Sequence, residues 1–160
     1  MNKKIFIIFT IIFISLISKN IYCEDNAKIY VIKKLEFQEI NRWYASYIKK
    51  AIKKAGDEGA SLIILELDTP GGLLSSALSI KNYIIESDIP VVAYINKNAL
   101  SAGALISLSC EAIYMSDGSI IGAATPVYMK GNEIEKAGEK EISAMRAAMR
   151  SSAERSKKNV

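Results

Sequence analysis

The chain has 160 residues, half of them apolar, which suits one domain with a substantial core. Its formal charge is +4, but the first 23 positions hold three lysines and no acid, so 18 basic groups face 17 acidic ones in the rest. This near balance argues against a nucleic-acid-binding protein. The absence of histidine excludes a Ser-His-Asp triad, a Cys-His pair and a histidine-bound metal.

The first 23 residues have the pattern of a targeting segment. Lys3 and Lys4 precede an apolar run over 5–18, and a short polar stretch ends at Cys23. This run is shorter than the ~20 residues that a membrane span needs. We expect residues 1–23 to be a secretory signal peptide, with an N-terminal anchor or a lipid on Cys23 as alternatives. Residues 24–160 would then be exported, to the periplasm or the extracytoplasmic side of a membrane.

The cysteines predict neither a disulfide framework nor a metal site. If Cys23 is lost with the signal, Cys110 stands alone among apolar residues, which favours a buried and inert thiol. We therefore expect no metal and no cofactor.

Hydrophobic periodicity predicts strands that alternate with helices. The predicted strands cover 28–32, 61–67, 91–95 and 112–115, and the predicted helices cover 39–55, 73–87, 102–109 and 139–157. We expect an extended segment over 120–127 and a surface loop over 128–138. The βαβαβ order predicts an α/β fold with a parallel sheet. The nearly continuous apolar run over 61–67 predicts a sheet covered on both faces.

The helix predicted over 39–55 has an apolar stripe that includes Trp43 and Tyr47. Four lysines lie outside the stripe, at positions 49, 50, 53 and 54. We interpret these lysines as a solvated helix face, with contact to acidic lipid headgroups as the alternative.

Two segments that follow predicted strands carry the candidate chemistry, at 67–72 and 98–106. Strand ends meet at the carboxyl edge of a parallel sheet, where ligands usually bind. Ser101 offers a hydroxyl, and the N–H groups of Gly71, Gly72 and Ala102 could hold an oxyanion, as acyl transfer requires. Taken separately, Ser101 could be only an N-cap and Pro-Gly-Gly only a turn. Their pairing favours a nucleophile with an oxyanion hole.

Without histidine, a serine nucleophile needs another base, and lysine is the usual substitute. Lys140 lies in the first turn of the last predicted helix, where the positive helix end disfavours an ammonium. Small residues follow it on the same stripe, at Ala144, Ala147 and Ser151, so another element could pack there and exclude water. An ordinary surface lysine is the alternative for Lys140, and Lys97 and Lys136 are rival bases.

Four segments in order resemble the protease domain of NfeD-type membrane-bound serine proteases, which have the Clp-protease/crotonase-like fold. These segments are 64–72 (ILELDTPGG), 89–94 (IPVVAY), 99–104 (ALSAGA) and 118–124 (GSIIGAA). The resemblance covers residues 28–157 and implies a Ser-Lys dyad endopeptidase. By position in these motifs, Ser101 is its nucleophile and Lys140 its base, and the glycine pair supplies oxyanion donors.

The same resemblance implies a polypeptide substrate with an apolar segment, a stomatin-like membrane partner and a homo-oligomer of two or more copies. Members of the family continue beyond the last helix, so we expect this domain to be C-terminally incomplete. Alternatives are a signal-peptide peptidase of the SppA type, a crotonase-like acyl-CoA enzyme, and a catalytically inactive, membrane-associated scaffold of the same fold.

Overall fold

A computed structural model describes residues 27–33, 39–130 and 133–157. The predicted targeting segment 1–23 lies outside this part of the chain. Within the described residues, no helix is both long enough and apolar enough to cross a membrane.

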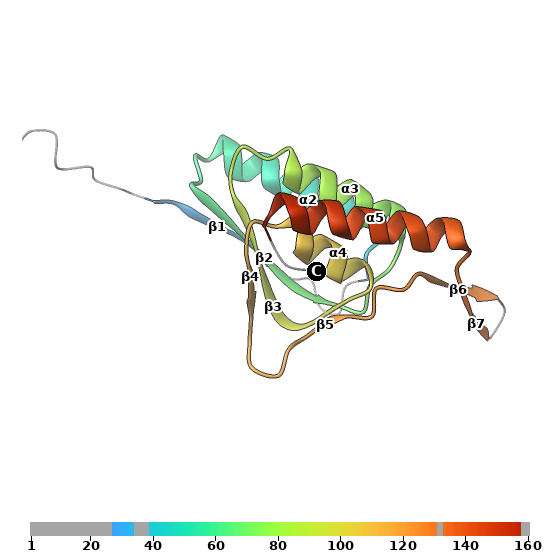
Figure 1. Cartoon of the computed structure of the whole chain (residues 1–160). Helices are drawn as coiled ribbons and strands as arrows, with labels where there is room; N and C mark the ends of the chain where they lie inside the picture. The colour runs from blue at the N-terminus through green and yellow to red at the C-terminus, as the bar shows by residue number, and fades with distance from the viewer. Residues whose placement is uncertain (1–26, 34–38, 131–132, 158–160) are drawn as a thin grey trace, which may run out of the picture.

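Five strands form the main sheet, and helices connect the first four (Figure 1). The elements in chain order are β1 (Ile29–Ile32), α2 (Arg42–Asp57), β2 (Leu62–Thr69), α3 (Leu74–Ile85), β3 (Val91–Leu100), α4 (Ala102–Ser109), β4 (Ile113–Met115), β5 (Ile120–Gly122), β6 (Val127–Lys130), β7 (Glu133–Lys136) and α5 (Glu139–Arg155). The strand order is β1-β2-β3-β4, all pairs are parallel, and β5 also pairs with β3 in parallel. The predicted parallel α/β fold is confirmed.

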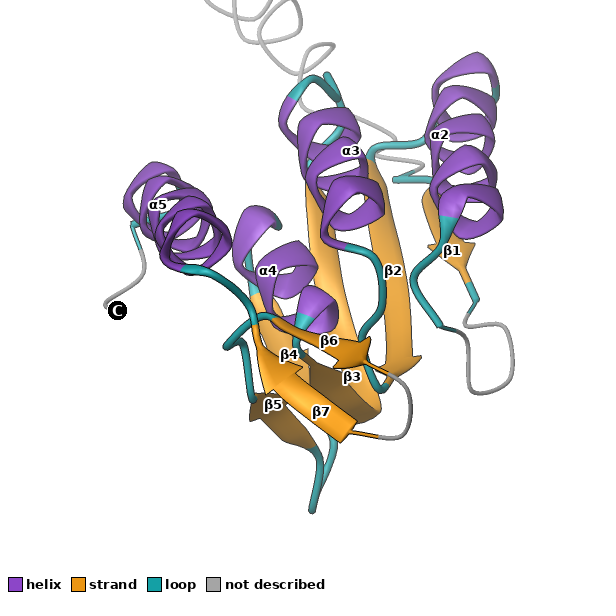
Figure 2. Ribbon diagram, turned by 90° about the vertical axis from the view of Figure 1, so that its right-hand side faces the viewer, coloured by secondary structure: helices purple, strands orange, loops and turns teal. Residues whose placement is uncertain are grey.

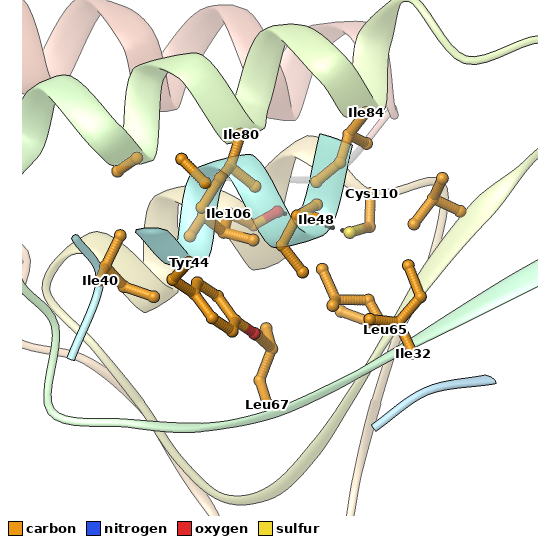
Figure 3. Close-up of a cluster of buried hydrophobic side chains, with 14 of the residues drawn as sticks. Ile32, Ile40, Tyr44, Ile48, Leu65, Leu67, Ile80, Ile84, Ile106 and Cys110 are labelled. Atoms are coloured by element: carbon orange, nitrogen blue, oxygen red, sulfur yellow. Dashed lines mark hydrogen bonds between the residues drawn. The ribbon is translucent and has the colours of Figure 1, made fainter. Parts of the chain in front are cut away.

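The helices of the described residues, α2, α3, α4 and α5, cover the same face of the sheet (Figure 2). The buried side chains between the helices and the sheet alternate along the strands, as period-2 geometry requires. Ile63, Leu65 and Leu67 of β2 meet Ile48 of α2 and Ile80 of α3 in this core (Figure 3). Cys110 is fully buried there, with its Sγ 3.4 Å from the carbonyl oxygen of Ile106, which confirms the predicted burial of this thiol.

The opposite face of the sheet is not covered by any described residue. Ile64, Val92, Tyr94 and Tyr114 point there and line a shallow apolar depression. The prediction that both faces of β2 are covered therefore does not hold within the described chain. A run of apolar residues on both sides of a strand shows that both faces are apolar, not that both are occupied.

Two residues of the apolar stripe predicted for α2, Trp43 and Tyr47, are not buried. Asn41 caps the helix by accepting a 2.9 Å hydrogen bond from the N–H of Tyr44, and Tyr44, Ile48 and Ala51 are buried. Trp43 is 85% exposed, and Tyr47 lies at the edge of the buried stripe. The prediction that these two aromatic residues belong to the apolar stripe was therefore wrong. Successive helix residues are 100° apart, so Trp43, one position before the buried stripe, turns away from the core.

Strand β3 is twice as long as predicted, because it continues from Ile95 to Leu100. The polar residues Asn96 and Asn98 remain in the strand through amide–carboxylate contacts with β2. Asn96 Nδ2 donates to Glu66 Oε1 at 2.7 Å, and Asn98 Nδ2 donates to Asp68 Oδ1 at 3.2 Å. Beyond the end of β4, strand β5 pairs with residues 98–100 of β3. No separate loop precedes Ser101.

The segment 128–138, predicted as a surface loop, forms most of an antiparallel hairpin instead. Strands β6 and β7 pair from Val127↔Lys136 to Lys130↔Glu133, and the hairpin projects beyond the sheet (Figure 1). The sequence between them is Gly131-Asn132, a pair typical of two-residue hairpin turns. The loop prediction was wrong because it counted glycines and charges and overlooked the alternation of Val127 and Met129 with polar neighbours.

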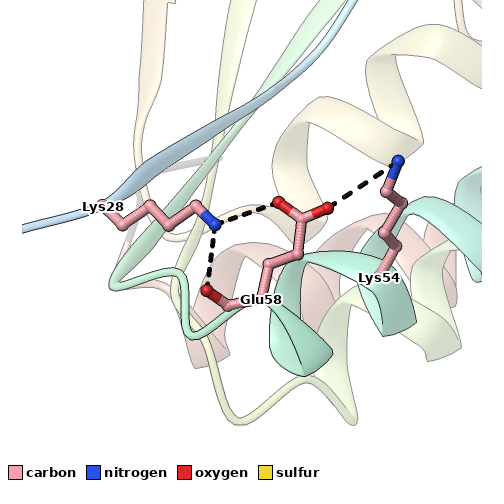
Figure 4. A network of polar contacts seen from close by, with 3 residues as sticks. All are labelled: Lys28, Lys54 and Glu58. Atoms are coloured by element: carbon pink, nitrogen blue, oxygen red, sulfur yellow. Dashed lines mark hydrogen bonds and ion pairs between the residues drawn. The ribbon is translucent and has the colours of Figure 1, made fainter.

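An ion-pair cluster ties the start of β1 to the end of α2 (Figure 4). Lys28 Nζ lies 3.0 Å from both the carbonyl oxygen and Oε2 of Glu58, and Lys54 Nζ lies 3.7 Å from Oε1. The hydrogen bond from Lys28 lowers the pKa of the Glu58 carboxyl, and the charges of the two lysines add to this.

A pH titration of stability tests this cluster. Because the pKa of Glu58 is lower in the folded chain, its contribution is complete above the unfolded pKa of about 4.3 and is lost as pH falls through the folded value. We expect Glu58→Gln to lower the free energy of unfolding at pH 7 and to match wild type once the pH is below the lowered pKa of the folded carboxyl. High salt at pH 7 should shrink the difference. An equal loss at both pH values would show that the charge is not involved.

The start of α4 packs closely on the end of β2. A Cβ added at Gly103 would lie 2.6 Å from Cγ2 of Thr69. Thr69 is buried, and its Oγ1 makes hydrogen bonds with Gly71, so its methyl group cannot easily turn away.

A double-mutant cycle tests this contact. We expect Gly103→Ala to lower the free energy of unfolding by about 1–3 kcal/mol, measured by urea denaturation. In a Thr69→Ser background the methyl group is absent, so Gly103→Ala should be neutral or stabilising because alanine favours helix. The same loss in both backgrounds would contradict the steric explanation.

Candidate active site

Ser101 is the only residue between strand β3 and helix α4, and its backbone is strained. Its φ is 51° and its ψ is −112°, a combination that non-glycine residues rarely adopt and that costs on the order of 1–3 kcal/mol. Two contacts hold it there: its N–H donates to the carbonyl oxygen of Gly122 at 2.8 Å, and its own carbonyl accepts from Ala104 at 3.0 Å.

The side chain of Ser101 does not cap α4. A capping serine takes extended backbone angles and accepts a hydrogen bond from the first turn of its helix, and Ser101 does neither. Its Oγ has no hydrogen-bond partner among the described residues, and the residue is half-buried. The simple N-cap interpretation is therefore excluded, and the hydroxyl is available to a ligand.

The glycine loop after β2 lies directly against Ser101. A Cβ added at Gly71 would lie 2.7 Å from Cβ and 3.3 Å from Oγ of Ser101, so only glycine permits this approach. Gly71 and Gly72 have φ values of 115° and 145°. A Cβ at Gly72 would collide with the backbone of Ile40.

Ile40 fixes the position of this loop from the other side. Its N–H donates to the carbonyl oxygen of Gly71 at 2.7 Å, and its carbonyl accepts from the N–H of Leu73 at 2.7 Å. The N–H of Gly71 donates to Thr69 Oγ1 at 3.1 Å. Thr69 was not predicted to be part of this site, although a threonine two residues before a glycine is a known turn former.

Two of the three N–H groups predicted as oxyanion donors have no hydrogen-bond acceptor among the described residues. The N–H of Gly72 makes no hydrogen bond to a described residue, and the N–H of Ala102 is in the first turn of α4, where no intrahelical acceptor exists. Gly71 becomes available only if its contact with Thr69 opens. The residues at the carboxyl edge of the sheet thus bring a free hydroxyl close to two free N–H groups.

A cavity of about 630 Å³ lies beside Ser101. Its walls are mainly apolar, and they come from the glycine loop, the segment after β5, and α5. The lining residues are Glu39, Pro70, Gly72, Leu73, Leu74, Leu100, Ser101, Ala102, Ala123, Thr125, Pro126, Val127 and Met145. The cavity can hold an apolar segment of a ligand next to the hydroxyl.

Lys140 does not lie at Ser101 in this structure. It is exposed at the start of α5, does not line the cavity, and makes no hydrogen bond with Ser101. The stripe predicted to exclude water around it, Ala144, Ala147 and Ser151, is also exposed, so nothing in the described chain packs on it. Met145 from the opposite side of the same helix does reach the cavity.

The two rival bases also lie outside the lining of this cavity. Lys97 and Lys136 are exposed, and neither lines the cavity beside Ser101. The structure therefore brings together the nucleophile and oxyanion donors that the sequence predicts, but none of the three candidate lysines.

The sheet order and the serine at the start of α4 define an α/β protein of Clp-protease-like fold. ClpP1 from Listeria monocytogenes, in a mutant form, aligns with a TM-score of 0.59 over 84% of this chain and 75% of that chain, at 20% identity. This likeness concerns the fold alone.

The chain belongs to the family of NfeD1b N-terminal domains, whose family model matches residues 28–160. Membrane protein NfeD1b of Bacillus subtilis is 43% identical over 99 residues, which are 62% of this chain and 23% of that protein. Membrane-bound protease PH1510 of Pyrococcus horikoshii is 33% identical over 126 residues, 76% of this chain and 29% of that protein. The chain thus spans less than a third of the length of either relative.

Solved structures of a related protease have the same architecture. A serine-to-alanine mutant of the 1510-N membrane-bound stomatin-specific protease aligns with a TM-score of 0.74 at 32% identity, over 82% of this chain and 65% of that chain. A lysine-to-alanine mutant in complex with a substrate peptide aligns with a TM-score of 0.72 at 30% identity, over 79% and 59%. The resemblance to NfeD-type proteins is confirmed.

Proposed function

We propose that this chain is a serine endopeptidase domain that uses Ser101 as its nucleophile. The observation that carries the proposal is Ser101 itself. Its backbone is strained, its Oγ has no hydrogen-bond partner among the described residues, and it faces the glycine loop at an apolar cavity. Strain of this kind persists only where the surrounding structure enforces it, and such sites are often functional. The membrane-bound protease PH1510 among its relatives supports the same reaction class.

In this reaction Ser101 Oγ attacks the carbonyl carbon of a peptide bond while a base removes the hydroxyl proton. The carbonyl oxygen becomes an oxyanion, which the N–H groups of Gly72 and Ala102 stabilise. The tetrahedral intermediate expels the amine, which takes the proton from the base, and leaves an ester on Ser101. Water then hydrolyses the ester with help from the same base.

We assign the base to Lys140. The chain has no histidine, and α5, which carries Lys140, already lines the cavity through Met145. Because Lys140 is exposed in this structure, the dyad forms only when the start of α5 approaches Ser101. One solved structure of a related protease with a substrate peptide is of a lysine-to-alanine mutant, which agrees with a lysine that is needed for chemistry and not for binding.

The apolar cavity supports a substrate with an apolar segment, and the stomatin-specific relatives support a stomatin-like membrane partner. We further propose that the domain is exported by residues 1–23 and works at the extracytoplasmic side of a membrane as a homo-oligomer. An inactive, membrane-associated scaffold of the same fold is the second candidate, favoured by the exposure of Lys140 and its small-residue stripe.

Labelling with a fluorophosphonate separates the two candidates. The reagent forms a covalent bond with an activated serine, so wild type should be labelled and Ser101→Ala should not. Lys140→Ala should reduce the labelling rate by at least about 100-fold, the usual contribution of a general base. Lys97→Ala is the matched control and should label like wild type. An inert but folded wild type would support the scaffold, and loss on Lys97→Ala alone would move the base.

The pH dependence of labelling tests the amine more directly. Only an uncharged amine can accept the proton of Ser101, so the labelling rate of wild type should rise with pH into the alkaline range. The residual rate of Lys140→Ala should depend much less on pH over the same range. Parallel profiles for the two proteins would remove Lys140 from the mechanism.

A further inference from the structure

A second depression lies away from the serine, between α2 and α3, which run side by side in the helical layer (Figure 2). It has a volume of about 520 Å³ and extends along both helices from their N-terminal ends. The helices are parallel to each other, because each follows one parallel strand and leads to the next. The positive ends of both helix dipoles therefore lie at the same end of this groove.

The charges that line the groove are all positive. Arg42 and Lys49 stand two turns apart on α2, and neither lies within 4 Å of a carboxylate of the described residues. Lys49 Nζ is 5.2 Å from the centre of the Tyr83 ring, which faces it from α3. No acidic side chain is part of the lining.

Hydroxyl groups provide the other polar lining of the groove. Four serines contribute, Ser46, Ser75, Ser76 and Ser79. Ser79 Oγ donates to the carbonyl oxygen of Ser75 at 3.0 Å. Ser76 is only 3% exposed, and its Oγ has no hydrogen-bond partner in the described part of the chain. A buried hydroxyl without a partner is unfavourable, so this group is suited to a ligand from outside the chain.

The start of α3 adds unneutralised donors. Its N-cap is Leu73, which has no side-chain acceptor, and the first turn contains no acidic residue. The first N–H groups of a helix have no intrahelical acceptor and favour anions. Ser75 and Ser76, which line the groove, belong to this turn.

We propose that the groove between α2 and α3 binds a phosphate-type oxyanion. Arg42 and Lys49 provide the countercharge, the hydroxyl of Ser76 donates to an anion oxygen, and the first turn of α3 adds backbone donors. A free phosphate or phosphomonoester and the headgroup of an anionic phospholipid share this chemistry. The exposed Trp43 beside Arg42 suits a lipid–water interface, so both sources are included in the test.

The test uses the full chain and two probes at one fixed salt concentration. Inorganic phosphate is titrated while the unfolding temperature is followed, and binding to phosphatidylglycerol vesicles is measured by flotation against phosphatidylcholine vesicles. We expect at least one probe to bind wild type. The double variant Arg42→Gln/Lys49→Gln should weaken that binding about tenfold or more. Lys50→Gln/Arg150→Gln removes the same two residue types outside the groove and should stay within about twofold of wild type.

A third variant addresses the buried hydroxyl. Without phosphate or vesicles, Ser76→Ala should unfold at or above the wild-type temperature, because an unsatisfied polar group has been removed. Its binding of the successful probe should nevertheless be weaker than that of wild type. Binding of phosphate alone assigns a soluble ligand, and binding of phosphatidylglycerol vesicles alone assigns a headgroup. No binding of either probe, or equal losses in the two double variants, would overturn the proposal.

Discussion

The close approach of two backbones, at Gly71 and at Ser101, determines the geometry of the whole carboxyl edge of the sheet. No side chain can stand between them, since a Cβ on Gly71 would already touch Ser101. Hydrogen bonds with Ile40, Thr69 and Gly122 hold the two segments from both sides. The hydroxyl and the free N–H groups are therefore positioned by main-chain contacts, and this suits a site that must be arranged before a substrate arrives.

Elements with a strong local pattern could be predicted from the sequence alone. Strand β2 is a continuous apolar run that ends just before Pro-Gly-Gly, and helix α3 is a periodic run that ends at Ile85. Their neighbours in the chain are also their neighbours in the fold. The extension of β3 to Leu100 could not be predicted, because it depends on pairing with β5, some twenty residues later. Polar residues such as Asn98 look like a loop until the carboxylate opposite them is known.

In the candidate site too, some features could be predicted from the sequence and others could not. Ser101 and Gly72 follow from the rule that ligands bind where parallel strands end, and a local reading of the chain is sufficient to find them. The environment of Lys140 is different, because a stripe of small residues indicates only that something could pack there. Within the described chain nothing does, and the apolar face of the sheet at Ile64 and Tyr94 is likewise open. Sequence patterns record which surfaces suit contact, whereas the contacts themselves depend on what else is present.

The local sequence also could not predict that the N–H of Gly71 is already hydrogen-bonded within the protein. Gly71 carries the right backbone for an oxyanion hole, but its N–H is held by Thr69, whose place is fixed by pairing with Ala99 on β3. A turn that is stabilised by an internal hydrogen bond uses one of its own N–H groups for it, and that group is then not available to a ligand. The two N–H groups that remain come from different elements, Gly72 from the loop and Ala102 from α4, so their relative position depends on how strand and helix are docked.

Thr69 uses both branches of its side chain at once. Its oxygen bonds the glycine loop, while its methyl group fits the space left by Gly103 on α4. Serine would retain only the first of these contacts and valine only a hydrocarbon. The configuration at Cβ matters as well, since allo-threonine at this position would exchange the two branches and direct each toward the wrong neighbour. The handedness of one carbon atom thus helps to set the distance between the loop and the helix on either side of the cavity.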